Sequence, residues 1–132
     1  MKYVIVFTWI DLLVCAAFAL PIISDLTLSL LNLASTQLNF AAVEVAAGTS
    51  RFFVNLAGFF GALWNIAMLK SQEPNLHRVD LLARCWLILL IVFHINASDL
   101  SPIFAVFILT EIIGGLYKVI WMRNQAAVNL PY

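Results

Sequence analysis

The chain has 132 residues, of which 64% are hydrophobic and 11% are charged, and its formal net charge at pH 7 is zero. Soluble proteins are closer to about half apolar and a quarter charged, so a water-soluble domain of this composition would expose much apolar surface. The balance of seven acidic and seven basic residues gives no indication of a nucleic-acid-binding surface. We therefore predict one integral membrane domain over residues 1–132, with the lipid bilayer as its first partner.

The first apolar stretch, about residues 3–23, is long enough to span a membrane as a helix. Its basic start and its Ala17-Phe18-Ala19 sequence resemble a cleavable signal peptide. Asp11 interrupts the apolar run, however, so we expect this segment to be retained as a membrane helix.

The following segment, residues 24–50, has a different pattern. Polar residues recur in it at three- and four-residue steps: Asp25, Ser29, Asn32, Thr36 and Asn39. Leucines lie mostly on the opposite side, which is typical of an amphipathic helix. We predict that it lies at the membrane interface or continues the first span outward past a kink at Pro21. A fifth span is disfavoured, because the polar stripe would then have to face other protein.

Three further windows, about residues 52–69, 79–96 and 103–121, have the length and composition of spanning helices. Short polar connections containing Pro74 and Pro102 separate them. Short connections favour antiparallel neighbours. The predicted fold is all-α, a transmembrane up-down four-helix bundle with an amphipathic segment after the first helix.

The basic residues predict the orientation. With the N-terminus inside, six of them fall at or near the cytoplasmic ends of the helices: Lys2, Lys70, Arg78, Arg84, Lys118 and Arg123. Only Arg51 would lie outside, together with Asp25, Glu44 and Asp99. The positive-inside rule therefore places both termini in the cytoplasm.

Polar residues embedded in the apolar helices are the candidate site. They are Asp11, Arg51, Asn55, Asn65, Arg84, His94 and Glu111. A charge at mid-membrane costs at least about 2.5–3.5 kcal/mol, so such residues should face the bundle interior and find partners. Three interpretations are open for them. They are structural and fix helix order and rotation, they line a polar pocket for a small ligand, a quinone head group or a proton, or they contact another subunit.

Depth along the helices predicts the first pair. Counted at 1.5 Å per residue, Asp11 lies about 12 Å from the inner surface, near the depth of Arg84 on the third span. We expect these two residues to pair, helped by Asn65. Asp80 is four residues before Arg84 and offers a competing pair on the same helix.

Glu111 lies about 12 Å from the outer surface by the same count. Residues nearer that surface are Arg51 and Asn55 on the second span and His94 on the third. We therefore expect Glu111 to pair with Arg51 or His94, helped by Asn55. Long arginine side chains reach several ångströms along the membrane normal, so differences in depth do not prevent this pairing.

Other chemistries lack their residues. His94 is the only embedded histidine, whereas a bis-histidine haem needs two, and no zinc spacing, phosphate loop or nucleophile motif is present. We predict no catalytic residue, metal or cofactor. Cys15 and Cys85 fall in apolar runs without a CxxC motif and are expected to be buried thiols. The small residues Ala57 and Gly61, and Gly114-Gly115, predict close helix contacts.

Three stretches carry a resemblance to a known family: "SRFFVNLAGFFGALWNIAML" with Arg51, "LLARCWLILL" with Arg84, and "ILTEIIGGLY" with Glu111. With a first span ending at Pro21 and a semi-polar segment after it, residues 1–123 resemble the DoxX-like small four-helix membrane proteins. The resemblance implies this architecture and a role for Arg51, Arg84 and Glu111. Members of that group are associated with quinone-linked oxidoreductase assemblies or with accessory or chaperone-like roles, so the resemblance implies more about architecture than about an activity.

Two functions are expected from these features. The first is a non-catalytic accessory subunit or assembly partner of a larger complex of membrane protein subunits in the bacterial inner membrane. The second is a binder of a lipophilic small molecule, such as a quinone or lipid, in an intramembrane polar pocket. Proton-coupled transport by the same residues is less favoured, because inverted repeats and broken helices with paired Gly or Pro are not evident.

Overall fold

The computed structural model describes residues 2–44, 48–71, 73–97 and 100–128. Its elements are α1 (Lys2–Ala19), α2 (Pro21–Gln37), α3 (Gly48–Lys70), α4 (Pro74–Ala97), η1 (Pro102–Phe104) and α5 (Ala105–Val128). No strand occurs in these described ranges. The prediction of an all-α fold is confirmed.

Three helical segments are long and apolar enough to cross a membrane: α3, α4 and the segment Pro102–Gln125. Helices α1 and α2 meet the same test only together, and they are bent by 107° at the break between them. The described residues therefore contain three candidate spans, or four if the bent pair counts as one. These helices have the length and composition of an integral membrane protein.

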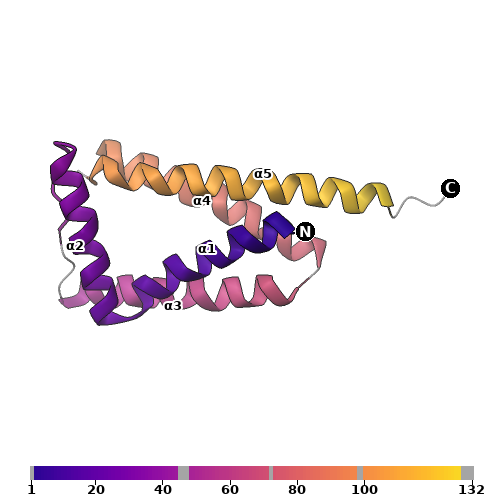
Figure 1. Cartoon of the computed structure of the whole chain (residues 1–132), viewed down its shortest axis with the longest axis horizontal. Coiled ribbons are helices and arrows are strands. Elements are labelled where there is room, and N and C mark those ends of the chain that lie inside the picture. Colours follow the sequence, from indigo (N-terminus) through magenta and orange to yellow (C-terminus); the bar gives the residue numbers. More distant parts are fainter. Residues whose placement is uncertain (1, 45–47, 72, 98–99, 129–132) are drawn as a thin grey trace.

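The break between α1 and α2 follows from Pro21. Proline disfavours helical geometry at the residue before it, and Leu20 is extended, with φ −98° and ψ 120°. Pro21 then begins α2, where its missing N–H is not needed. The helix predicted over about residues 3–23 therefore ends at Ala19. Helix α2 turns across the end of the other helices, as Figure 1 shows.

The long helices form two packed pairs, α1 with α3 and α4 with α5, which meet through α1 and α5 (Figure 1). Gly58 allows the closest approach, because a Cβ there would lie 2.6 Å from the carbonyl carbon of Phe18 and 2.8 Å from the carbonyl oxygen of Cys15. Gly61 faces the Cys15 thiol, whereas Ala57 is exposed. The glycines thus make the contact predicted for Ala57 and Gly61. Consecutive helices α3 and α4 barely contact each other, so an evenly packed up-down bundle is not confirmed.

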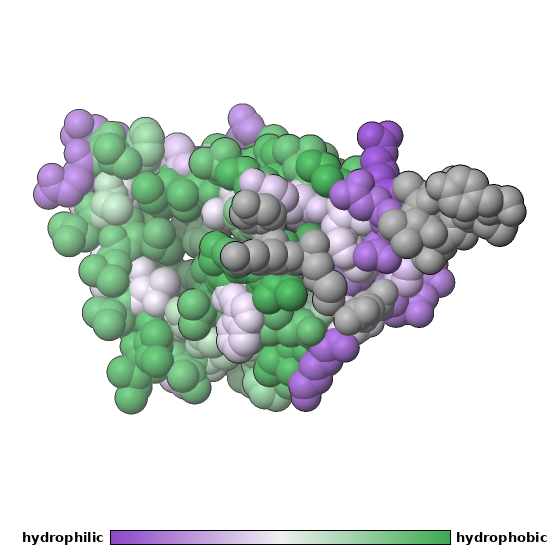
Figure 2. Space-filling view, turned by 45° about the vertical axis from the view of Figure 1, so that its right-hand side comes forward, coloured by the Kyte–Doolittle hydropathy of each residue, from purple (hydrophilic) through white to green (hydrophobic). Residues whose placement is uncertain are grey.

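The outer surface of the molecule is strongly apolar. On the face in Figure 2, hydrophobic residues form a broad area, and most of the hydrophilic residues gather toward its right-hand side. Leucines of α2 also point outward: Leu26, Leu30 and Leu33 are each more than half exposed. Cys85 is exposed as well, so the prediction of a buried thiol is wrong for this residue. Surfaces of this kind require lipid or other protein against them.

Candidate functional site

Arg84 of α4 is the centre of a buried network of charges. Its Nε donates to Asp80 at 2.8 Å, its Nη1 donates to Glu111 at 2.7 Å, and its Nη2 donates to Asp11. Each nitrogen of the guanidinium group thus binds a different carboxylate. Only 7% of the Arg84 side chain is exposed, so these charge-assisted bonds are shielded from solvent and individually strong.

Asp80 extends the network to a second cation and to α3. Lys118 of α5, whose side chain is 1% exposed, donates to Asp80 Oδ2. Trp64 of α3 donates from its indole nitrogen to Asp80 Oδ1 at 2.7 Å. The network therefore connects α1, α3, α4 and α5 through one set of polar side chains.

Helical spacing places these residues on facing surfaces. Asp80 and Arg84 are one turn apart on α4, and Glu111 and Lys118 are two turns apart on α5. Gly114 lies between the last two in sequence, and a Cβ there would come within 3.0 Å of Arg84 Nη1. The glycine therefore leaves the space that the guanidinium group occupies.

Beside the network is a pocket of about 1090 Å³ lined by all five α-helices and by the segment that follows α2. Most of its wall is apolar, including Phe18, Leu28 and Phe107. Asp11 and Glu111 belong to both the pocket wall and the network, and each side chain is 13% exposed. The pocket is thus an apolar chamber with two carboxylates in its wall, and Arg84 lies behind them.

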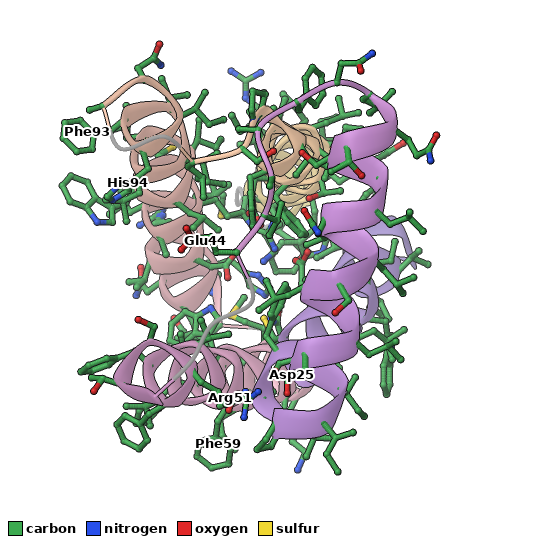
Figure 3. The ribbon with its side chains drawn as sticks, turned by 90° about the vertical axis from the view of Figure 1, so that its left-hand side faces the viewer. Asp25, Glu44, Arg51, Phe59, Phe93 and His94 are labelled. Atoms are coloured by element: carbon green, nitrogen blue, oxygen red, sulfur yellow. The ribbon has the colours of Figure 1, made fainter. Side chains whose placement is uncertain are left out.

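Arg51 is not part of this network. It binds Asp25 of α2 at 2.5 Å, and both side chains are about one-third exposed or more; Figure 3 shows the two residues side by side. Asn55 donates to the carbonyl of Phe18 at 2.7 Å and to Ser24 Oγ at 2.9 Å. It therefore satisfies a carbonyl at the end of α1, where the helix cannot supply a partner.

The predicted pair of Asp11 and Arg84 is confirmed. The predicted partners of Glu111, Arg51 or His94, are wrong, because Glu111 binds Arg84. His94 lies on the exposed outer side of α4 next to Phe93, as Figure 3 shows.

The predicted helper residues also have other roles. Asn65 donates to the Gly61 carbonyl at 2.9 Å and contacts the Cys15 sulfur at 3.7 Å, so it strengthens the α1–α3 contact instead of the Asp11–Arg84 pair. Asn55 likewise serves the end of α1 and not Glu111.

Three members of the network were not predicted as site residues: Asp80, Lys118 and Trp64. Asp80 was expected only as a competing partner of Arg84 on the same helix, and it binds Arg84 as well as Lys118 and Trp64. Lys118 was counted only as a charge at the cytoplasmic end of its helix. Its spacing from Glu111, two full helical turns, places both on one face of α5 and is the signal that identifies it. For Trp64 the sequence holds no such signal, since its partner Asp80 is on another helix.

The carboxylates are organised around cations and not around a metal position. In the described part of the chain, no group of three or more His, Cys, Asp or Glu side chains is arranged to hold a metal ion. What this arrangement offers chemically is hydrogen-bond acceptance and negative charge next to a large apolar volume.

Comparisons with models of protein families, with curated proteins and with solved structures gave no match. The resemblance to the DoxX-like proteins therefore stays a prediction that depends on the three sequence stretches. A function for this chain has to be argued from the pocket and its residues.

Proposed function

We propose that this chain is an intramembrane binding protein for a lipophilic small molecule, which occupies the pocket between the two helix pairs. The observation that carries the proposal is the pocket itself, about 1090 Å³ and mainly apolar, with Asp11 and Glu111 in its wall. Ligand pockets in proteins combine a mostly apolar lining with a few polar groups that orient the ligand.

The supporting geometry is the separation of α3 from α4. These helices are consecutive in the chain but barely contact each other, and residues of both line the pocket, among them Val54, Ala57 and Leu87. Packed helices would remove this volume, because protein interiors normally leave few voids larger than a water molecule. A bound lipophilic molecule would supply the missing contacts.

The proposed placement in the membrane supports access from lipid. In it, α1, α3, α4 and α5 span the bacterial inner membrane with both termini in the cytoplasm, and α2 lies at the outer interface. The pocket then lies at membrane depth, and a ligand dissolved in the bilayer could enter without crossing water.

The test uses thermal unfolding of the full chain in phosphatidylcholine nanodiscs against a panel of quinones, sterols and single-chain lipids. A true ligand at about 100 times its Kd stabilises the protein by about 2.7 kcal/mol, which raises Tm measurably. Ala57→Phe should fill the pocket and abolish the rise. Ala67→Phe is the matched control, because Ala67 is exposed on the same helix but lies outside the pocket.

Absence of a saturable rise for every member of the panel would contradict the proposal. An equal rise in Tm for the Ala57→Phe variant would mean that the ligand binds elsewhere on the protein. That result would also contradict the proposed binding pocket.

A second candidate function is the accessory subunit, favoured by the outer face of α3. Phe52, Phe53, Phe59 and Phe60 are each at least half exposed, and the two pairs are seven residues apart, which places them on one face. A neighbouring membrane subunit could pack against this face. The accessory role would be supported if a stoichiometric partner copurifies in mild detergent and is lost when Phe59 and Phe60 are changed to Ala. Purification of the chain alone would oppose this role.

A further inference from the structure

The charged residues that line the pocket in the described part of the chain are all acidic. Among the described residues, Asp11, Glu44 and Glu111 line it, and no lysine or arginine does. Asp11 and Glu111 lie in its wall, whereas Glu44 is on the segment that crosses between α2 and α3 in Figure 3 and is itself exposed. A ligand therefore meets carboxylates both near the exposed segment and at the network.

The network behind the wall does not cancel this charge. With all its groups ionised, Asp11, Asp80 and Glu111 are three negative charges, whereas Arg84 and Lys118 supply two positive ones. One negative charge is left over. Lys118 contacts Asp80 and is absent from the pocket wall, so the excess lies on the side of the carboxylates that face the pocket.

An uncompensated charge in a low-dielectric interior is costly, and an opposite charge brought next to it is correspondingly favoured. In the described part of the chain, Asp11 and Glu111 each accept one hydrogen bond, and both bonds come from Arg84. A carboxylate has several lone pairs in two oxygens. Both residues therefore keep capacity to accept from a donor in the pocket.

From this charge and hydrogen-bond balance we infer that the ligand is a cationic amphiphile, with a protonated amine bound between Asp11 and Glu111 and its hydrocarbon part in the apolar chamber. The inference rests on the proposed binding function and names its ligand class. An ammonium group supplies up to three N–H donors and one positive charge. A quinone head group offers only carbonyl acceptors, which carboxylates cannot satisfy.

Three single-chain probes with the same hydrocarbon and different head groups test the inference: hexadecylamine, hexadecanol and hexadecanoic acid. Each is titrated into the full chain in phosphatidylcholine nanodiscs, and its apparent Kd is taken from the rise in Tm. The comparison is made as the ratio of amine to alcohol affinity for each variant. Partitioning into the bilayer is common to all variants and cancels between them.

We expect the amine to bind at least about tenfold more tightly than the alcohol, because hydrogen bonds to charged groups contribute more than neutral ones. The acid should bind most weakly. Asp11→Asn and Glu111→Gln should each reduce the amine preference by about tenfold while leaving the alcohol affinity within about threefold. Asp25→Asn, the same change in a pair that does not line the pocket, should leave the preference unchanged.

The outcomes separate the two proposals. If the alcohol, the acid or a quinone binds as tightly as the amine, the head-group inference is overturned, and the binding function survives. If the amine preference persists in both carboxylate variants, the inference is also overturned, since another group must then hold the amine. If none of the probes and no quinone binds saturably, the binding function fails together with it.

Discussion

Replacing Arg84 with Met tests whether the buried network holds the two helix pairs together. Methionine keeps most of the length of the side chain and removes its charge and its hydrogen bonds. After the change Asp80 still contacts Lys118 and Trp64. Asp11 and Glu111 lose the donor that binds each of them among the described residues.

The expected loss is large because these charges are shielded. Breaking a buried ion pair by removing one partner costs about 3–5 kcal/mol, since the other charge is left uncompensated. Arg84 binds three carboxylates and is 7% exposed, so we expect a loss in the free energy of unfolding of at least about 3 kcal/mol.

The measurement is reversible unfolding of the purified chain in mixed micelles of mild detergent and dodecyl sulfate. Arg51→Met is the matched control, because the pair of Arg51 with Asp25 is substantially exposed, at 43% and 34%. Such exposed pairs contribute only about 0–1 kcal/mol. Adding Asp11→Asn and Glu111→Gln to the Arg84→Met variant should restore part of the loss, with a coupling of about 0.5–3 kcal/mol. Equal losses for Arg84→Met and Arg51→Met would refute the reasoning.

Three more predictions follow from the packing, the network and the proposed orientation. Gly58→Ala should lower the free energy of unfolding by about 1–3 kcal/mol, because the added Cβ meets the backbone of α1. Gly115→Ala is the control and should lower it little, because a Cβ there meets only a leucine methyl at 3.6 Å. Equal losses for the two variants would contradict the close α1–α3 contact. Trp64→Phe should lower the free energy of unfolding by about 1.5–3 kcal/mol, because it removes a hydrogen bond to the charged carboxylate of Asp80. Trp9→Phe, on the exposed side of α1, should change it by no more than about 0.5 kcal/mol. Similar values for the two variants would show that the Trp64 bond does not stabilise the chain. A cysteine at Leu100, in a background without the native cysteines, should react with a membrane-impermeant thiol reagent on intact cells; reaction only after permeabilisation would reverse the proposed orientation.

Residues that act along one helix were predictable from the sequence. The sequence predicted a kink at Pro21, because proline restricts the residue before it and lacks an N–H. Leu20 is extended, so the first helix ends at Ala19 and not near residue 23 as predicted. The apolar windows predicted α3, α4 and α5 because the length needed to cross a bilayer is fixed. Asp11 and Arg84 were paired correctly because the rise per residue gives depth.

The partner of Glu111 was predicted wrongly because the sequence gives the depth of a residue in the membrane but not the direction in which its side chain points around the helix. The count along each helix gives height in the membrane, but it does not say which helices are neighbours. Arg84 reaches Glu111 because α4 packs on α5. Arg51 instead binds Asp25, because α2 turns across the end of the molecule and brings its N-terminal part close to α3.

The amino-acid sequence alone determined that this chain is helical and apolar, that Pro21 distorts its first helical region, and that its buried charges need partners, because these properties depend on short-range chemistry and on composition. Only the tertiary structure decided that α1 pairs with α3 and α4 with α5. It also decided that Arg84 binds three carboxylates at once and that a pocket remains between α3 and α4. The pocket depends on which helices pack closely and which do not, and such a property arises from the packing of the whole chain and from no single segment of it.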